Sequence, residues 1–285
     1  MKGHPLPVTV SRLTIFPPTQ RIAAVIETMS AATPADQFPH LNHAPIVEAV
    51  IDFRAPFRAK WVPEDLKREL AKALPEYPII EAALQPEFSL PVAGNPAGVK
   101  IANLGCKGLR FRTKEQKYVV QFNRDGFAFS HLPPYERWDS FVAEALRLWE
   151  IFSMVGQHDK VQRVGVRYIN RLPLPLSSDR APLQLGDYLH NPPRSLPNLE
   201  WPCAVFFHKT TFNVPEAHFS VNLISTVEKP QPEANILPVI GDVDVFTRNV
   251  IFQPREATAQ LPEMRKLKNQ AFFGAIQAKT VELLK

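Results

Sequence analysis

Three arginines, Arg163, Arg167 and Arg171, recur at every fourth position of the segment RVGVRYINRLPLP. Side chains alternate between the two faces of a β-strand, so residues four apart lie on the same face. We expect residues 161–172 to form a strand whose apolar residues, such as Val166 and Tyr168, pack against helices. A guanidinium group is a planar fork of donors that fits a carboxylate or a phosphate. The row therefore predicts either ion pairs with acidic neighbours or a site for an anion.

Four carboxylates are the candidate partners of this row. Glu48 and Asp52 lie on the polar face of a strand predicted around residues 47–54, and Asp242 and Asp244 share a face in the segment GDVDVF. If the first strands of the two halves of the chain pair, acidic and basic side chains interleave. Each such cross-strand pair contributes about 0.2–1 kcal/mol. A solvated ion-paired face, an anion-binding groove and a protein-binding surface all remain open.

Arg110 and Arg112 lie two residues apart in LRFRTKEQKYVVQF and extend the set of candidate ligand-binding residues. Basic and aromatic residues also alternate there and in FFHKTTF, residues 206–212. Aromatic side chains on a strand can stack nucleic-acid bases. However, Phe111 and Phe122 fall at positions expected for the core. A sequence-tolerant nucleic-acid-binding protein is therefore the second hypothesis, and its binding would weaken steeply with added salt.

Asp242 and Asp244 also form a D-x-D pair, which raises a third hypothesis, a metal-dependent hydrolase or nuclease. Hard cations need several oxygen ligands, and the nearby arginines compete for these two carboxylates, so ion pairing is the favoured role. Glu48 and Asp52 would be about 13 Å apart along a strand. Because a retaining glycosidase needs its two carboxylates about 5 Å apart, that activity is excluded.

The remaining sequence contains no motif that names a reaction. The eight histidines show no zinc-protease spacing, and no Walker loop, dinucleotide fingerprint or G-x-S-x-G elbow occurs. Cys106 and Cys203 are too few for a disulfide framework or a complete zinc site. We therefore predict no metal and no cofactor, and a non-catalytic role is favoured over an enzyme.

Composition is that of a globular chain. Of the 285 residues, 45% are hydrophobic, and 33 basic against 28 acidic side chains give a net charge of +5. This excess permits a nucleic-acid or other anionic partner without requiring one. No apolar run is long enough to span a membrane, and the N-terminus lacks the features of a signal peptide. The sequence predicts a cytoplasmic protein and does not indicate its oligomeric state.

The order of predicted elements divides the chain into three parts. Residues 1–38 are an expected poorly ordered extension, with Met1 and Met29 as alternative starts. Residues 39–157 and 158–285 are two similar halves of one compact unit. Each half reads as a strand, a helix, three or four strands and a long helix. The sequence therefore predicts an α+β fold in which each half has an antiparallel sheet with long helices packed on one face.

Several segments match the landmarks of a known family in order and spacing. They are APIVEAVIDF (44–53), PYERWDSF (134–141), RVGVRYINRL (163–172), VDVF (243–246) and LKNQAFF (267–273). In these segments the chain resembles a sporadically distributed, uncharacterised bacterial family of about 250–280 residues. The resemblance covers residues 41–285 and implies no established activity. The patchy distribution is similar to that of genes in mobile defence or toxin–antitoxin-like modules. We therefore expect a binding or accessory protein that recognises a protein partner or an anionic ligand through the charged sheet face.

Overall fold

The computed structural model describes residues 38–86, 103–176, 183–194, 201, 203–229 and 231–285. Apart from Phe38, the expected extension and both alternative starts lie outside the described residues. Phe38 itself stacks on Phe273, with ring centroids 4.9 Å apart. The described chain is therefore anchored to the helical layer from its first residue.

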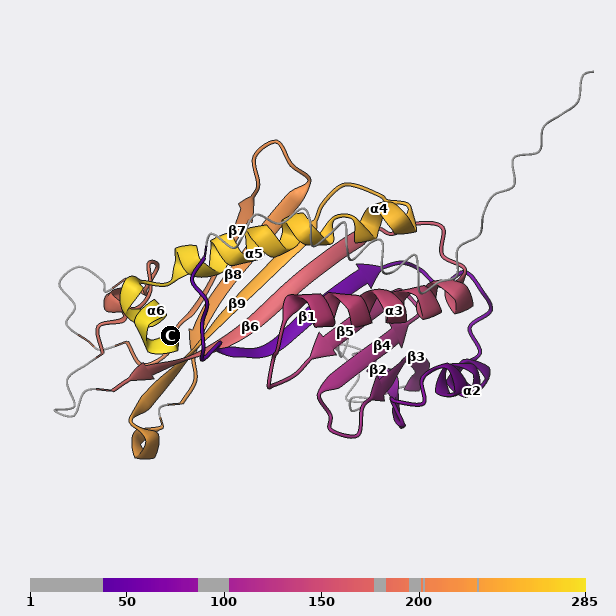
Figure 1. Ribbon diagram of the computed structural model, residues 1–285, viewed down its shortest axis with the longest axis horizontal. Coiled ribbons are helices and arrows are strands. Elements are labelled where there is room, and N and C mark those ends of the chain that lie inside the picture. The colour runs from indigo at the N-terminus through magenta and orange to yellow at the C-terminus, as the bar shows by residue number, and fades with distance from the viewer. Residues whose placement is uncertain (1–37, 87–102, 177–182, 195–200, 202, 230) are drawn as a thin grey trace, which may run out of the picture.

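The described strands form one nine-stranded antiparallel sheet in the order β2-β3-β4-β5-β1-β6-β9-β8-β7 (Figure 1). Their bounds are β1 Ile46–Arg54, β2 Ile79–Pro86, β3 Asn103–Arg112, β4 Tyr118–Asn123, β5 Gly126–His131, β6 Arg163–Pro175, β7 Phe207–Asn213, β8 Phe219–Val227 and β9 Ile236–Thr247. The helices are α2 Pro63–Ala73, α3 Trp138–Gly156, α4 Pro254–Thr258, α5 Leu261–Ala275 and α6 Ala278–Leu284, with 3-10 turns at Leu185–Asp187 and Pro232–Ala234. The α+β class is as predicted.

The first strand of each half lies at the centre of the sheet. β1 and β6 pair antiparallel, with Val50 opposite Arg167 and Asp52 opposite Gly165. The sequence predicted a sheet for each half. Because β1 and β6 are hydrogen-bonded neighbours, the two sets of strands instead form one continuous sheet.

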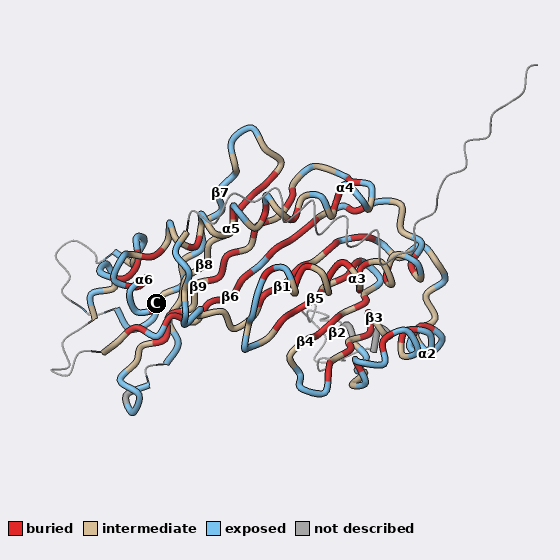
Figure 2. Tube along the Cα trace, viewed as in Figure 1, coloured by how far each residue is buried: buried red, intermediate tan, exposed pale blue. Residues whose placement is uncertain are grey.

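The helices α3 and α5 lie along the same face of the sheet, α3 over the strands of the first half and α5 over those of the second (Figure 1). The core lies between these helices and the sheet, where alternate strand residues are buried (Figure 2). Ile51, Val166 and Phe152 are examples with no exposed surface. We call the opposite face of the sheet, away from α3 and α5, the polar face.

The C-terminal region differs from its prediction. The helical pattern of residues 261–284 predicted one closing helix, but the chain breaks between α5 and α6. Ile276 is extended there (φ −114°, ψ 145°) and forms a β-bridge with Leu189. The amide of Gln277 also donates to the carbonyl of Tyr188 at 2.9 Å. Pairing with this distant segment replaces the hydrogen bonds that a continuous helix would have made.

Candidate functional site

All nine charged residues that the sequence singled out for ligand binding lie on the polar face. Register places them together, because Arg167 is opposite Val50 on one side and Asp244 on the other, and directly opposite residues share a face. The set is Glu48, Asp52, Arg110, Arg112, Arg163, Arg167, Arg171, Asp242 and Asp244. The residues of β1, β6 and β9 form a central cluster, whereas Arg110 and Arg112 lie on β3, separated from β1 by β4 and β5.

Arg163 joins carboxylates on both neighbouring strands. One terminal nitrogen donates to Asp52 on β1 at 2.5 Å, and the other donates to both oxygens of Asp244 on β9 at 3.2 Å. The guanidinium carbon also lies 5.0 Å from the ring centroid of Phe246. Gly165 makes room for this pair, since a Cβ there would lie 1.9 Å from Asp52 Oδ2. Arg163 is therefore held from three sides.

This ion pair belongs to a polar row that crosses five strands. Thr211 on β7 donates to Asn222 on β8 at 2.8 Å, and the Asn222 amide donates to Asp244 at 3.2 Å. Arg163 and Asp52 continue the row to β6 and β1. Burial raises the pKa of Asp244 above its usual value, although the charge of Arg163 opposes this shift. The positive charge of Arg163 therefore helps to keep the largely buried carboxylate of Asp244 ionised.

Arg167 forms the second ion pair, and its two partners differ sharply in exposure. Its Nε and one terminal nitrogen bind the two oxygens of Asp242 at 2.9 and 2.6 Å. The Asp242 side chain is 7% exposed, whereas that of Arg167 is 45% exposed. The hydrogen bonds that Arg167 donates to Asp242 raise the pKa of Arg167, with smaller contributions from the charges of Asp244 and Glu48. The other terminal nitrogen of Arg167 has no acceptor among the described residues.

The other predicted arginines bind carboxylates that the sequence did not single out. Arg171 donates to Glu228 at 2.7 Å, and Glu81 of β2 lies 3.3 Å from Arg112 and 3.8 Å from Arg110. Glu228 follows β8 directly and Glu81 lies on an edge strand, so only the strand order reveals that they are neighbours of these arginines. The one signal in the sequence that could have indicated Glu228 and Glu81 is that acidic residues lie near the ends of the predicted strands.

The predicted aromatic platform for bases is mostly part of the core. Phe111 and Phe122 are buried, and Tyr118 is partly buried against Phe129 and His131 of β5. Phe207 differs, because 70% of its surface is exposed on the edge strand β7.

A second polar network, which the sequence did not indicate, connects α3 to the loop after α2. Tyr77 donates to Glu144 at 2.6 Å, and Arg147 binds Glu144 and Glu76. Burial alone would raise the pKa of Glu144, but the bonds from Arg147 and Tyr77 lower it below its usual value. Burial also raises the pKa of Tyr77 well above its usual value. Every charged member thus has a partner, as expected of a network that fixes a helix in place.

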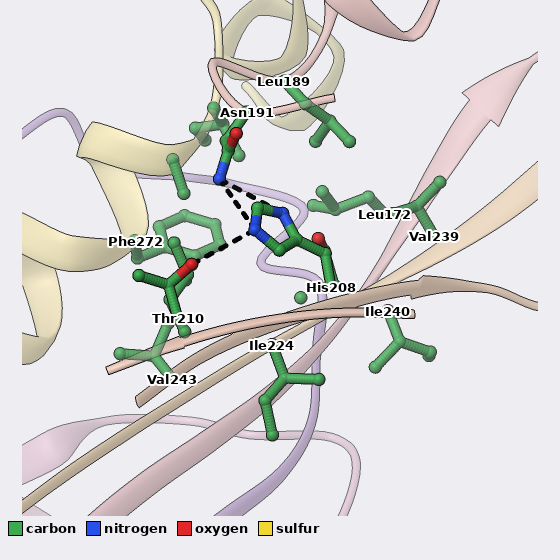
Figure 3. A pocket seen from close by; sticks show the side chains of 15 residues that line it. Leu172, Leu189, Asn191, His208, Thr210, Ile224, Val239, Ile240, Val243 and Phe272 are labelled. Atoms are coloured by element: carbon green, nitrogen blue, oxygen red, sulfur yellow. Dashed lines mark hydrogen bonds between the residues drawn. The ribbon is translucent and has the colours of Figure 1, made fainter. Parts of the chain in front are cut away.

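A small cavity of about 30 Å³ lies between α5 and the strands of the second half (Figure 3). Its walls are mainly apolar, including Leu172, Val243 and Phe272. At its mouth the His208 ring is 3.1 Å from the amide of Asn191 and 3.2 Å from the hydroxyl of Thr210. A volume of this size accommodates about one or two water molecules, so it is a packing gap rather than a ligand pocket.

No three His, Cys, Asp or Glu side chains in the described part of the chain gather closely enough to hold a metal ion. None of the described helices combines the length and the apolar character needed to cross a bilayer.

A scan of the sequence against models of protein families found no match, and a search of curated proteins found none either.

Proposed function

We propose that this protein is a non-catalytic binding or accessory protein that recognises a protein partner through the polar face of its sheet. One observation carries the proposal. Arg167 lies at the centre of that face, is half-exposed, is oriented by a buried carboxylate and has a donor nitrogen without an acceptor among the described residues. A fixed guanidinium group with a free donor is well suited to recognise a carboxylate or a carbonyl.

The balance of charges favours a protein partner over a nucleic acid. The five predicted arginines all lie 2.5 to 3.8 Å from a carboxylate. Nucleic-acid affinity depends on cations that replace the counterions of phosphate groups, and paired arginines are poor replacements. A face of alternating charge instead matches another protein surface with the opposite alternation.

The metal-dependent hydrolase is the weakest of the three hypotheses. Asp242 uses both oxygens for Arg167, and Asp244 uses both for Arg163. A divalent cation would have to displace these guanidinium groups before it could bind.

We also propose that the two halves are a structural repeat. Support comes from the strand order, in which each half goes from its central strand, β1 or β6, to an edge strand and then returns strand by strand to the centre, and from the long helices α3 and α5. The halves are not equal, since a 3-10 turn at Leu185–Asp187 takes the place in the second half that α2 holds in the first. A cytoplasmic location and a mobile-module context complete the proposal and rest on the sequence alone.

Native mass spectrometry of the protein isolated gently from its host tests the proposal. Wild type is compared with Arg167→Ala and with Arg68→Ala, which removes an exposed arginine of α2 that pairs only locally with Asp65. Circular dichroism verifies that each variant is folded. We expect wild type and Arg68→Ala to carry a protein partner, and Arg167→Ala to lose most of it.

Two outcomes would contradict the proposal. If Arg167→Ala retains the partner as well as wild type does, the polar face is not the recognition surface. If the bound species is a nucleic acid whose binding falls steeply with salt, the nucleic-acid hypothesis replaces this one.

A further inference from the structure

The two edges of the sheet are built differently. Along β2, the pairing with β3 shifts register between Ala83 and Leu84 and again between Leu84 and Pro86, and Glu81 places a carboxylate on the strand. Bulges, prolines and charges are the usual devices by which proteins keep an edge strand from pairing with another chain. β7 has no bulge and no proline, because all seven residues pair with β8 in one unbroken register, and Lys209 is its single charged residue.

β7 and the segment before it also expose apolar side chains on an otherwise polar surface. Trp201 is 77% exposed, Val205 75%, Phe207 70% and Phe212 52%. A regular edge strand that exposes apolar side chains is a site where another strand adds to the sheet.

The free hydrogen-bonding groups of β7 follow from its pairing with β8. The amide of Val214 donates to Phe219, which is opposite it in the hairpin. Hydrogen-bonded pairs alternate along an antiparallel ladder, so Phe212, Thr210 and His208 point their backbone groups toward β8. The backbone groups of the alternate residues, Phe207, Lys209, Thr211 and Asn213, therefore point away from the sheet.

We propose that β7 pairs antiparallel with β7 of a second copy of this chain, across a two-fold axis at Thr210. This register hydrogen-bonds Lys209 to Thr211 of the second copy and Phe207 to Asn213, so all the outward groups are satisfied. It pairs the full seven residues. A register centred on Lys209 would place two like charges directly opposite each other, which is destabilising.

The pairing also covers part of the exposed side chains of both copies. His208 comes to lie opposite Phe212 of the second copy on the helix side, and Phe207 opposite Asn213 on the polar face. A fully buried aromatic side chain covers about 150–250 Å². At the observed exposures, the aromatic surface available for burial is therefore on the order of 400 Å² per copy, from Trp201, Phe207 and Phe212. Two copies, with Val205 and the strand backbones, approach the roughly 1,000 Å² expected of a specific interface. Two nine-stranded sheets would become one.

Analytical ultracentrifugation of the full chain, over a range of concentrations, tests this arrangement with two matched variants. Thr211→Glu places a carboxylate opposite Lys209 of the second copy, and Thr211→Lys places a like charge there. Both variants lose the same hydrogen bond to Asn222 and gain a long charged side chain, so they differ mainly in the sign of the charge. Because the two-fold axis doubles each pair, we expect Thr211→Lys to weaken dimerisation on the order of tenfold and Thr211→Glu to strengthen it.

Cross-linking tests the register itself. At a non-hydrogen-bonded pair the Cα atoms are about 4.5 Å apart, which is within the range of a disulfide. In a Cys203→Ser background, Thr210→Cys should therefore form a disulfide-linked dimer under mild oxidation, and Thr211→Cys should do so far more slowly. A folded protein that remains monomeric at all concentrations would overturn the proposal. So would a dimer that is indifferent to both charges at position 211 and to Thr210→Cys.

Discussion

Among single residues, the ion pair of Arg167 and Asp242 matters more to Asp242. Its carboxylate is buried and would lose its partner, whereas Arg167 can still be solvated by water. Arg167→Ala leaves this carboxylate without its partner. A buried acceptor that loses its donor costs about 1–3 kcal/mol, and more when it is charged, but the half-exposed position of Arg167 lets water reach the site and favours the lower part of that range. We expect urea denaturation to show a loss of about 1–2 kcal/mol.

Arg68→Ala is the control for this measurement, since Arg68 and Asp65 are both well exposed. Its effect should stay within about 0.5 kcal/mol. Equal losses for the two variants would show that the Arg167–Asp242 pair behaves as an ordinary surface pair.

His131 predicts a pH dependence of stability. Its ring is fully buried among Tyr118, Tyr135 and Phe141, and burial lowers its pKa below 6.5, with further repulsion from Lys117 that Glu136 partly offsets. The unfolded chain therefore binds the proton more readily than the folded protein does. Stability is full above about pH 6.5 and falls as the pH drops below it, until the pKa of the folded state is reached.

His131→Phe removes the titrating group and keeps an aromatic ring in the aromatic cluster. The loss of unfolding free energy between about pH 7.5 and about pH 5.5 should be smaller in this variant than in wild type. Some dependence remains from His158, whose pKa burial also lowers. An unchanged pH profile would show that His131 is not the source.

Much of the central cluster was predictable from residue types, because alternation along a strand places Arg163, Arg167 and Arg171 on one face. The sequence also identified Asp242 and Asp244 as their ion-pair partners. Glu81 and Glu228 were not found, since their contacts depend on strand order and register. Alternation fixes the face of a residue but not its neighbour on the next strand.

At the scale of elements, Gly241 on β9 leaves a gap beside the cavity under α5. A Cβ placed there meets no atom within 4 Å, and its backbone is not in the left-handed region. Gly241→Ala should therefore stabilise the protein by about 0.4–1 kcal/mol, because alanine restricts the unfolded chain. Thermal and urea unfolding measure this gain.

Gly126→Ala is the contrasting variant. A Cβ at Gly126 would lie 2.4 Å from the carbonyl oxygen of Phe53, which is backbone and cannot move aside cheaply. This substitution should destabilise the protein, and a gain of stability from it would contradict the packing described between β5 and β1.

The individual helices and strands were largely readable from periodicity, and the failures have a common cause. α5 and α6 read as one helix because their apolar spacing continues through residues 261–284. The break at Ile276 comes from pairing with Leu189, which is a long-range contact without a local signal. The pattern of residues 203–213 predicts a single strand, but β7 begins only at Phe207.

At the scale of the whole molecule, the pairing of β1 with β6 predicts that the described halves unfold together. One set of buried side chains connects both groups of strands to α3 and α5. Tryptophan fluorescence reports mainly on the first half through the buried Trp138 and Trp149, whereas far-ultraviolet circular dichroism reports on both halves. We expect coincident urea midpoints for the two signals. Separate midpoints would show that the halves are independent folding units.

The α+β class was predictable from the order of elements, but the single continuous sheet was not. Each half has enough strands for a sheet of its own, and nothing in a local pattern states which strands meet. The charges were the only sequence signal that the first strands of the two halves pair. Pairing would bring Asp52 next to the arginine row, where opposite charges can form ion pairs.

The central claim, that the polar face is where a partner docks, is tested most directly by arginine footprinting with phenylglyoxal. The protein carrying its host partner is compared with the same protein after the partner has been stripped away by salt. Arg167 and Arg68 have side chains 45% and 67% exposed, so both are open to the reagent. If the partner docks on the polar face, it should slow modification of Arg167 and leave that of Arg68 unchanged. Equal modification of Arg167 in the two samples would contradict that claim.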